Sequence, residues 1–508
     1  MSLNYSVDGM KDFDQRWDPL PNNGNMYCVP TACTNMMAFL SEQGHPNLWR
    51  KLASFMPGSS PKYSPQNTQY NISIMADYMD TDPQDGTGNS DALDGIEDFV
   101  DDRYFGSWYS RACSNDDTIK IDHLKAHFAL KRIGAVCFGR YERDNPNNSN
   151  SYDRMSGHCI TVSGLKISGD NVKLYYHDPA QGANNNLNTQ SPVLEHSLAL
   201  SNKGISVDGD WRYGIKMHTD GNLRMIDSYF IMAPMFMIDF NDINNVVSFS
   251  QEVNNKGNIS IEQKTVNVKN IIGEVASMVT DPESTVVYLT SKNKKGIWKL
   301  PLDTMEPELI NDVLQPDNIT VANDGETVLF NVNSKIFSLS ADKKLEEMTE
   351  LDVKPDALSY DMKRKQLLAV SQKGSLYTID KTKKVIKTTI PTAETGSNRL
   401  QVGFDAEGDR LYTFNDHTKS MIWVPLKKGI VAGNYIQPYQ NQNQLTHIRP
   451  MGKTKFTAVE NNRLKFFDKK GSEIKTLWND IPVGKVHIVP QKVNRFRSET
   501  SDLKKWKN

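Results

Sequence analysis

The chain has 508 residues, a formal net charge of −2, 38% hydrophobic residues and 24% charged residues. These values are typical of globular proteins and argue against nucleic acid as a partner, because no strongly basic region is present. No apolar run approaches the ~20 residues that cross a bilayer as a helix, so we expect no membrane span. A chain of this length normally folds into two or three domains.

The N-terminus leaves the cellular location open. Met1-Ser2-Leu3 is followed by neither the basic nor the apolar region of an export signal. The same residues fit a cloning leader that replaced a native signal. An extracytoplasmic or secreted location is favoured if the N-terminus was trimmed, and a cytoplasmic location otherwise.

A cysteine at the expected start of a helix is the first chemical feature of the chain. The segment Cys28-Val29-Pro30-Thr31-Ala32 runs into apolar residues at helical spacing between Met36 and Leu40. This spacing predicts a helix that begins at or just before Cys28, with Pro30 tolerated in its first turn. A helix N-terminus favours a thiolate, which is the form that attacks carbonyl groups. Cys28 is therefore the candidate nucleophile.

Two later segments supply the partners of such a nucleophile. Gly157-His158 precedes an apolar strand pattern, and Asp178-Pro179 ends the next strand pattern. The turn sequence Ser168-Gly169-Asp170-Asn171 predicts that the two strands form a hairpin, which would bring His158 and Asp178 close together. His158 would then act as general acid and base. Asp178 would accept a hydrogen bond from the other ring nitrogen and fix its tautomer.

These segments resemble the bacteriocin-leader-peptidase-like branch of the papain superfamily. In that group a Cys-x-Pro-Thr-Ala element opens the central helix, a Gly-His supplies the base and an Asp-Pro supplies the third member. The resemblance extends to about residue 240 and implies an α+β papain-like domain with cysteine peptidase activity. Val29 departs from the group, in which glycine usually follows the cysteine.

The resemblance also implies a glutamine whose side chain donates to the oxyanion, together with the backbone N–H of the cysteine. Gln15 matches this element because Trp17 follows it closely. Its distance from Cys28 is longer than the papain spacing, at which Asn22 falls. Gln15 is therefore included with Cys28, His158 and Asp178 as a candidate catalytic residue.

Other interpretations of the same residues stay open. A cysteine at a helix start is most often a small buried residue, and Gly-His and Asp-Pro are common turn elements. A catalytically inactive pseudo-protease would keep the fold and serve as a binding protein. A thiol acyltransferase of the transglutaminase-like kind would use the same residues but transfer the acyl group to an amine.

The remaining cysteines suggest no further site. Cys33, Cys137 and Cys159 lie in apolar patterns and are predicted to be small core residues, whereas Cys113 lies in a polar loop. The chain has five cysteines, and an odd number argues against a complete disulfide framework. No Cys-x-x-Cys is present, so a zinc ribbon is not expected.

Two patterns were weighed as metal sites. His123 and His127 lie one helical turn apart, but Leu124 stands where a zinc protease has glutamate, so an exposed helix face is predicted. The acidic stretch from Asp80 to Asp91 lacks the spacing of an EF-hand and is predicted to be a flexible loop. We therefore expect neither a metal nor a cofactor.

The second half of the chain contains a repeat. Pairs of short alternating strands recur about every 40 to 45 residues, with first strands at Val286, Val328, Leu368, Tyr412 and Thr457. This period predicts β-propeller blades, with a β-sandwich as the alternative. No blade ends in Trp-Asp, so the repeat looks more like the divergent propellers often attached to bacterial enzymes. Turn aspartates such as Asp281, Asp361 and Asp405 are predicted to bond the backbone.

The whole sequence predicts a multidomain protein. We expect an α+β papain-like domain at residues 1–245, a linker or edge hairpin at 246–264 and an all-β propeller of five to seven blades at 265–508. The expected function is a cysteine hydrolase that cleaves peptide or isopeptide bonds in a protein or peptide substrate. The propeller is expected to dock the substrate or to bind a protein or surface partner.

Overall fold

The structure is a computed structural model that describes most of the chain. The described residues are 2–42, 46–50, 63–102, 107–112, 119–143, 151–180, 194–199, 205–207, 210–212, 215–217, 223–233, 238–240, 245–253, 259–283, 285–322, 324–361, 364–371, 374–390, 400–404, 410–415, 420–427, 430–432, 436–440, 445–451, 455–461, 463–468, 471–478 and 485–487. The chain divides into two compact units, the first built mainly from Met1–Pro234 and the second from Met235–Ser250 and Gln263–Arg495. The main break therefore falls at residue 234, before the expected domain limit at 245.

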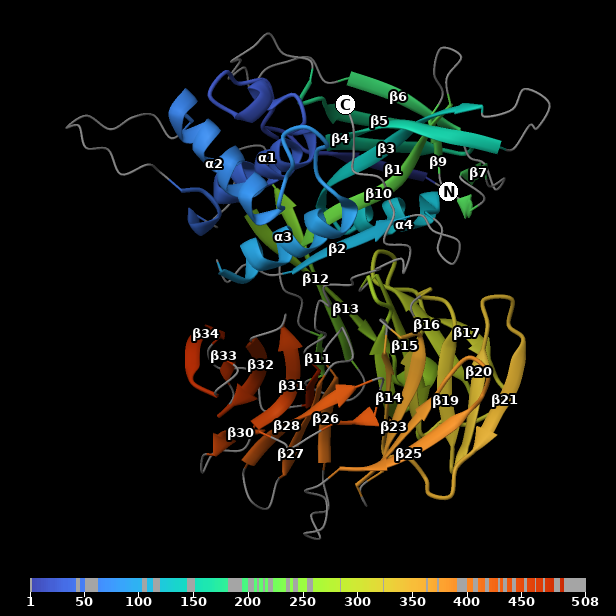
Figure 1. The fold of residues 1–508 in the computed structure, drawn as a ribbon. Helices are drawn as coiled ribbons and strands as arrows, with labels where there is room; N and C mark the ends of the chain where they lie inside the picture. The colour runs from blue at the N-terminus through green and yellow to red at the C-terminus, as the bar shows by residue number, and fades with distance from the viewer. Residues whose placement is uncertain are drawn as a thin grey trace. The chain divides into compact units, whose positions relative to one another are not determined.

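The first unit combines helices with a large antiparallel sheet (Figure 1). Its helices are α1 (Cys28–Glu42), α2 (Pro65–Tyr78), α3 (Asn89–Asp102) and α4 (Ile121–Ala129), with short 3₁₀ turns at Pro21–Gly24 and Pro46–Leu48. Its strands are β1 (Ser2–Ser6), β2 (Ser107–Ala112), β3 (Ile133–Arg143), β4 (Ser151–Ser168), β5 (Asn171–His177), β6 (Leu194–Ala199), β7 (Ile205–Val207), β8 (Asp210–Arg212), β9 (Ile215–Met217) and β10 (Leu223–Ala233).

The pairings within this sheet close on themselves. β3 pairs with β4, β4 with β5, β5 with β6, β6 with β9, β9 with β10, and β10 returns to β3. β1 adds to β4, and β2 adds to β10. A closed circuit leaves few free strand edges and fixes the register of the central strands.

The predicted hairpin between the apolar strands is confirmed. β4 and β5 pair with Ser168 opposite Asn171, so Gly169 and Asp170 form the turn. Gly169 has a φ of 60°, a left-handed conformation that glycine adopts without a steric penalty. The hairpin places the end of β5 beside the middle of β4, where Thr161 is paired with His177.

Helix α1 is the central element of the unit. Every residue from Cys28 to Ser41 is buried, because small and apolar side chains surround the helix on all sides. It packs against β4, β3 and α2. The segment before it adds Phe13 and Trp17 to an aromatic core cluster that also contains Trp49. The predicted helix start at Cys28 is confirmed.

The second unit consists almost entirely of short strands. They are β11 (Ile238–Phe240), β12 (Asn245–Val253), β13 (Ile259–Asn267), β14 (Val275–Thr280), β15 (Val286–Ser291), β16 (Ile297–Pro301), β17 (Glu308–Asn311), β18 (Asn318–Val321), β19 (Val328–Val332), β20 (Lys335–Leu339), β21 (Leu345–Glu350), β22 (Ala357–Asp361), β23 (Gln366–Val370), β24 (Ser375–Ile379), β25 (Val385–Thr389), β26 (Leu400–Phe404), β27 (Arg410–Asn415), β28 (Ser420–Lys427), β29 (Ile430–Val431), β30 (Ile436–Gln440), β31 (Leu445–Met451), β32 (Lys455–Glu460), β33 (Arg463–Asp468), β34 (Glu473–Trp478) and β35 (Lys485–His487), and the short helix α5 (Lys269–Ile272) lies between β13 and β14. β12 and β13 form a two-stranded sheet over most of the predicted linker or edge hairpin, and the part of this segment at Gln251–Glu262 is grouped with the first unit.

The repeat predicted from the sequence corresponds to consecutive antiparallel sheets. Within the described part of the chain, four of these sheets have four strands each, β14–β17, β18–β21, β22–β25 and β31–β34, and a fifth is built on β26–β28. The first strands of successive sheets lie against one another: β14 on β18, β18 on β22, β22 on β26 and β26 on β31. Four-stranded sheets joined in this way are the blades of a β-propeller.

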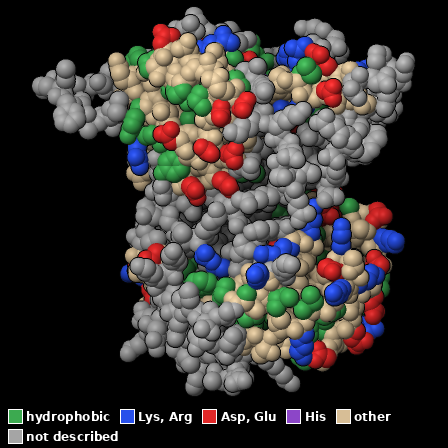
Figure 2. Space-filling view, viewed as in Figure 1, with side chains coloured by type: hydrophobic (Ala, Val, Ile, Leu, Met, Phe, Trp, Pro, Cys, Tyr) green, Lys and Arg blue, Asp and Glu red, His purple; other side chains and the backbone are tan. Residues whose placement is uncertain are grey.

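Apolar faces join each sheet to the next. One core cluster combines side chains of the first two sheets, another those of the second and third, and another those of the third and fourth. Exposed ion pairs between neighbouring sheets recur at separations of 35 or 37 residues: Lys343–Glu308, Lys354–Asp317, Lys383–Glu346 and Lys387–Asp352. Basic and acidic side chains accordingly alternate over the visible face of this unit (Figure 2). Exposed pairs add little stability, so the apolar faces hold the blades together.

Two further features of this unit concern its turns and its ends. Asp281 accepts hydrogen bonds from the backbone of Thr285 and Val286, both at 2.6 Å, and Asp361 accepts one from Arg364 at 3.1 Å, as predicted for turn aspartates. Asp405 lies outside the described residues. β11 pairs with β35, so the beginning and the end of the unit are hydrogen-bonded to each other. No helix among the described residues is long and apolar enough to cross a bilayer.

Deletion of residues 440–508 should destabilise the entire second unit. The deletion removes β31–β35, and with them the strands that pack against β26 and β27 and the partner of β11. We expect an aggregating protein by size-exclusion chromatography, whereas a control deletion of residues 491–508, which leaves every described strand in place, should stay soluble. A folded, monodisperse product from the longer deletion would contradict the packing account.

Candidate active site

The first turn of α1 presents Cys28 to the interior of the first unit. Thr31 N–H donates to the Tyr27 carbonyl at 3.0 Å, which starts the helix, and Pro30 occupies the first turn, where its missing N–H costs nothing. Cys28 is only 2% exposed. The side chains of His158 and Asp178 are more exposed, at 16% and 20%.

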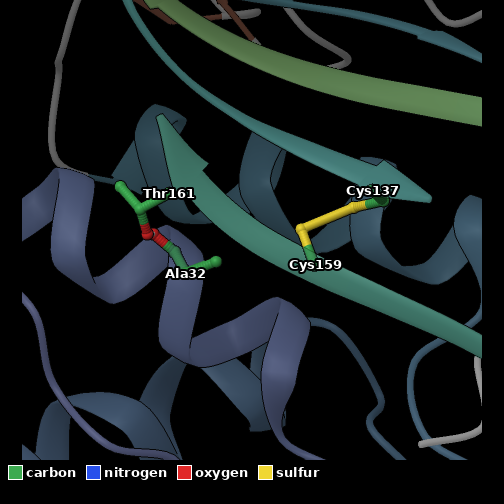
Figure 3. Close-up of a disulfide and its surroundings, with 4 residues drawn as sticks. All are labelled: Ala32, Cys137, Cys159 and Thr161. Carbon is green, nitrogen blue, oxygen red and sulfur yellow. A yellow bond between two sulfur atoms is a disulfide. The ribbon is translucent and has the colours of Figure 1, made fainter. Parts of the chain in front are cut away.

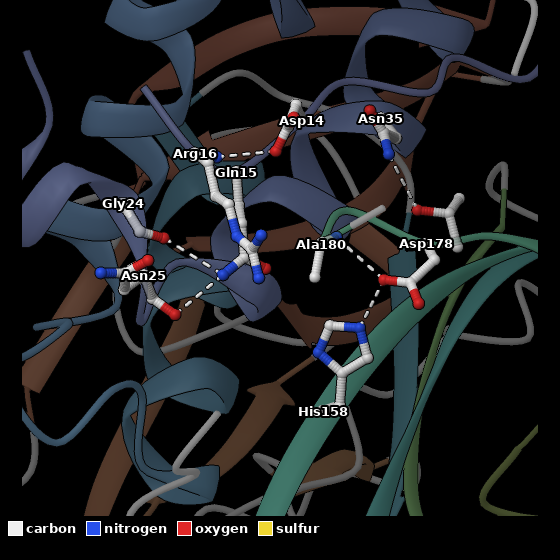
Figure 4. A network of polar contacts seen from close by, with 10 residues as sticks. Asp14, Gln15, Arg16, Gly24, Asn25, Asn35, His158, Asp178 and Ala180 are labelled. Atoms are coloured by element: carbon white, nitrogen blue, oxygen red, sulfur yellow. Dashed lines mark hydrogen bonds and ion pairs between the residues drawn. The ribbon is translucent and has the colours of Figure 1, made fainter. Parts of the chain in front are cut away.

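His158 and Asp178 form a direct hydrogen bond. His158 lies within β4, Asp178 follows the last residue of β5, and His158 Nε2 lies 2.6 Å from Asp178 Oδ1. The backbone N–H of Ala180 donates to the same carboxylate oxygen at 2.8 Å and holds it in place (Figure 4). The ring uses Nε2 for Asp178, which leaves Nδ1 for the thiol. The hairpin thus brings together two of the predicted residues.

The charges of the site depend on one another. Burial alone lowers the pKa of His158, but hydrogen bonds to Asp178 and Cys28 raise this pKa to about 10. Burial alone raises the pKa of Asp178, but the hydrogen bond from His158 and its positive charge lower it overall. An imidazolium between a carboxylate and the cysteine is therefore the stable form at neutral pH. This is the arrangement that a thiol nucleophile requires.

Gln15 lies in the segment that precedes α1. Its side-chain oxygen is buried without a described hydrogen-bond partner, whereas its amide nitrogen is bonded. Its Nε2 donates to the carbonyls of Asn25 at 2.8 Å and Gly24 at 3.2 Å (Figure 4). Both amide hydrogens are therefore used by the loop that precedes α1. Donation to an oxyanion would require one of these bonds to be exchanged, so the role of Gln15 stays a prediction.

The segment that carries Gln15 is attached to the segment that carries Asp178. The backbone N–H of Gln15 donates to the Pro179 carbonyl at 2.8 Å. His177 Nδ1 lies 3.5 Å from Asp12 Oδ2, and both side chains are buried. His177 therefore faces away from the thiol, as the strand alternation predicts, and does not compete as the base. Burial raises the pKa of the neighbouring Asp14 to about 6.

A buried asparagine that the sequence analysis did not single out links three elements of the site. Asn35 Nδ2 donates to Thr161 Oγ1 at 3.1 Å, and Asn35 Oδ1 accepts from the Phe13 N–H at 2.9 Å. Thr161 Oγ1 in turn donates to the Ala32 carbonyl at 3.2 Å. Asn35 and Thr161 are fully buried. These bonds fix α1 to β4 close to His158 and to the segment close to Gln15.

The cysteines require one correction. Cys137 and Cys159 are buried as expected, but they form a disulfide between β3 and β4 (Figure 3). They are cross-strand partners in the register, one residue away from Phe138 and His158, respectively. Their pairing could not be predicted from residue patterns, because it depends on the register of the two strands. Cys33 is a fully buried free thiol, as predicted, and Cys113 lies outside the described residues.

The prediction that both histidines of α4 lie on an exposed face is wrong for His127. His127 is fully buried, and its Nδ1 lies 2.9 Å from a guanidinium nitrogen of the buried Arg132. In the acidic stretch, Asp82 Oδ1 accepts from the backbone N–H groups of Gln84 and Asp85, which closes a tight turn. In the part of the chain that the structure describes, no group of three or more acidic, histidine or cysteine side chains is placed to hold a metal.

Comparisons with known proteins do not assign a family. No protein-family profile and no curated protein matches the chain. One similar solved structure is the nidogen/laminin complex, with 14% sequence identity and a TM-score of 0.37 over 48% of this chain and 92% of that chain. A second is the streptogramin B lyase structure, with 16% sequence identity and a TM-score of 0.36 over 48% of this chain and 79% of that chain. A third is regucalcin from Agrobacterium tumefaciens, a calcium-binding protein, with 14% sequence identity and a TM-score of 0.32 over 40% of this chain and 73% of that chain. At these values the matches carry no conclusion about what this chain does.

The proton on His158 should persist well above neutral pH. Because folding raises its pKa, the pair with Asp178 contributes fully to stability below the unfolded value of about 6.5 and loses this contribution as the pH rises through about 10. In Asp178→Asn the histidine should titrate about one to three pH units lower. NMR of labelled histidine, with His158→Gln for assignment, measures this; a ring that titrates near 6.5 in both proteins would contradict the ion pair.

Asn35→Leu should lower both the stability and the reactivity of Cys28. It leaves the Phe13 N–H and the Thr161 hydroxyl buried without their partner, at a cost of about 2–4 kcal/mol in the free energy of unfolding. Asn71→Leu is the matched control, since Asn71 in α2 is also buried and bonded to the backbone of Arg50, away from His158. Chemical denaturation and iodoacetamide labelling should show stability lost in both variants but labelling slowed only in Asn35→Leu.

Proposed function

We propose that this protein is a cysteine hydrolase that cleaves peptide or isopeptide bonds. The observation that carries the proposal is the 2.6 Å contact between His158 and Asp178. The interaction with Cys28 also raises the pKa of this imidazole. Perturbed titratable groups arranged as nucleophile, base and orienting acid are typical of a catalytic site. Burying an ion pair rarely stabilises a fold, because removing the charges from water costs free energy, so stability alone does not account for this arrangement.

In the acylation step, the sulfur of Cys28 attacks the carbonyl carbon of the scissile bond, and the carbonyl oxygen becomes an oxyanion. The carbon–nitrogen bond then breaks, and His158 gives its proton to the departing amine. The product is a thioester on Cys28 and a free amine. Asp178 holds the ring in the orientation that points Nδ1 at the sulfur and stabilises the imidazolium.

In the second step, neutral His158 removes a proton from water, and the hydroxide attacks the thioester carbon. The carbon–sulfur bond breaks, which releases a carboxylic acid and restores the pair of Cys28 and His158. We place the oxyanion at the backbone N–H of Cys28, with Gln15 as the second donor once it exchanges a bond to Gly24 or Asn25. An amine in place of water would make the same site an acyltransferase.

We also propose that the first unit belongs to the papain-like fold and resembles the bacteriocin-leader-peptidase-like branch. The helix opened by the cysteine, the buried strand with the histidine and the acid on the neighbouring strand support this assignment. Val29 and the spacing of Gln15 remain its departures from that branch.

The second unit is proposed to dock a macromolecular substrate or partner. In its described part, the turn aspartates Asp281 and Asp361 bond the backbone, and no group of three or more acidic, histidine or cysteine side chains is placed to hold a metal. Docking predicts that the full chain cleaves an intact protein with a lower KM than a short peptide that contains the same scissile bond. Equal KM values for the two substrates would remove this role.

Substitutions in the three residues should rank in a defined order. Cys28→Ala and His158→Ala should lower kcat by about 10⁶-fold and Asp178→Asn by about 10⁴-fold, the ranking seen in triads that act as a unit, because asparagine still orients the ring without its charge. Cleavage of a peptide library, read by mass spectrometry, measures these rates. Wild-type cleavage by Cys28→Ala would end the enzyme proposal.

The same assay separates hydrolysis from acyl transfer. Addition of a primary amine such as glycine amide should leave free carboxylic acids as the main products if water is the acceptor. Amidated products in excess over acids would identify an acyltransferase, and folded protein without any turnover would favour the pseudo-protease.

A further inference from the structure

A positively charged side chain lies beside the proposed triad on the same face of the sheet. The guanidinium carbon of Arg224, in β10, lies 5.7 Å from the ring centroid of Phe138. Phe138 in turn meets the His158 ring edge-on, with centroids 5.6 Å apart, and the two residues are direct cross-strand partners. Arg224 is therefore separated from the proposed base by one aromatic ring.

The charge of Arg224 also reaches the other strand of the site. Burial raises the pKa of Tyr176 to about 12, and the positive charge of Arg224 acts against this rise. Tyr176 lies near the end of β5, two residues before Asp178, and the negative charge of Asp178 also acts on Tyr176. Tyr176 therefore senses the charge of Arg224 from β10 as well as that of Asp178.

The position of Arg224 breaks a pairing rule of the sheet. It lies directly opposite Arg140 in β3, and like charges in directly opposed positions destabilise a sheet. Arg140 forms an ion pair with Glu142, whose Oε1 lies 2.7 Å from a guanidinium nitrogen. No carboxylate among the described residues lies within ion-pair distance of Arg224. Local rules of this kind are broken most often at functional positions.

The contact with Phe138 leaves the guanidinium able to bind a ligand. The attraction acts between the positive charge and the ring, so it leaves the five N–H donors of the guanidinium available for hydrogen bonds. Those N–H groups match the two oxygens of a carboxylate. A partly exposed arginine, held in place by a ring and without a described acid, is suited to an anionic ligand.

We infer that Arg224 binds a carboxylate of the substrate, so that the site prefers an acidic side chain near the scissile bond. The inference rests on the proposed function and adds the class of substrate to it. Arg224 acts in binding, and the chemistry stays with Cys28, His158 and Asp178.

Two matched reagents test this preference on the full-length protein. N-iodoacetyl-β-alanine and N-iodoacetyl-β-alaninamide carry the same electrophile, and both lose iodide when the sulfur of Cys28 attacks. They differ only in a terminal carboxylate or carboxamide. The labelling rate of Cys28 with each reagent, read by mass spectrometry of the cysteine peptide, gives a carboxylate-to-carboxamide ratio that cancels changes in the reactivity of the thiol.

Arg224→Gln should lower the carboxylate-to-carboxamide ratio about three- to fivefold, which is the effect expected of a partly exposed ion pair. The ratio of Arg224→Lys should lie between those of wild type and Arg224→Gln. Arg140→Gln is the control, since it removes the same charge from the opposite position but from an arginine that is already paired. An unchanged ratio in Arg224→Gln, or an equal fall in both variants, would overturn the inference.

The reagents also separate this inference from the proposed function. If the carboxamide reagent labels Cys28 much faster in wild type than in His158→Ala while Arg224→Gln leaves the ratio unchanged, only the substrate preference is wrong. If Cys28 labels no faster in wild type than in His158→Ala, the thiol is not activated, and both proposals fall together.

Discussion

The buried hydrogen bonds between α1 and β4 are the constraint on which the candidate site depends. Asn35 and Thr161 bind each other, and Thr161 also binds the Ala32 carbonyl, so helix and strand are fixed in one relative position. β4 belongs to a closed circuit of strands and cannot slide without breaking its pairings. The helix start and the histidine strand therefore meet at one place, which brings Cys28 to His158. Buried polar groups that are fully bonded specify such an arrangement more sharply than apolar packing does.

The second consequence of this packing is electrostatic. Burial would keep His158 neutral, yet the carboxylate of Asp178 and its contact with Cys28 raise the pKa of the ring. The site thus holds charges that a protein core normally avoids, and the surrounding bonds restrain them in productive positions. Phe138 contacts two charged side chains, because its ring lies between His158 and Arg224. The sheet face that carries His158, the proposed base, therefore also carries a positive group, which fits the proposed acidic substrate.

The sequence predicts those parts of the fold that local patterns determine. The helix start at Cys28, the turn at Gly169 and the repeat of the second half follow from helical spacing, turn residues and strand period, and the structure contains all three. The cross-strand disulfide could not be predicted, because it depends on the register that places Cys137 opposite Cys159. Asn35 was missed for a related reason. A polar residue in an apolar helix shows no pattern until its partners on other elements are known.

The environments of two histidines could not be predicted for the same reason, because they depend on contacts with other elements. The His127 ring meets Tyr229 of β10 edge-on, with ring centroids 5.6 Å apart, and His177 lies 3.5 Å from Asp12 of a distant segment. Likewise, the pairing of β11 with β35 joins residues far apart in the sequence. Contacts between distant segments are thus the part of the structure that composition and periodicity leave undetermined.

The central claim is that His158 activates Cys28, and selective labelling tests it most directly. The full-length protein is treated with less than one equivalent of iodoacetamide at neutral pH, and the label on each cysteine is quantified by mass spectrometry. The account predicts that Cys28 takes most of the label in wild type and loses this preference in His158→Ala. Label distributed to Cys113 in preference to Cys28, or a Cys28 fraction that His158→Ala leaves unchanged, would contradict it.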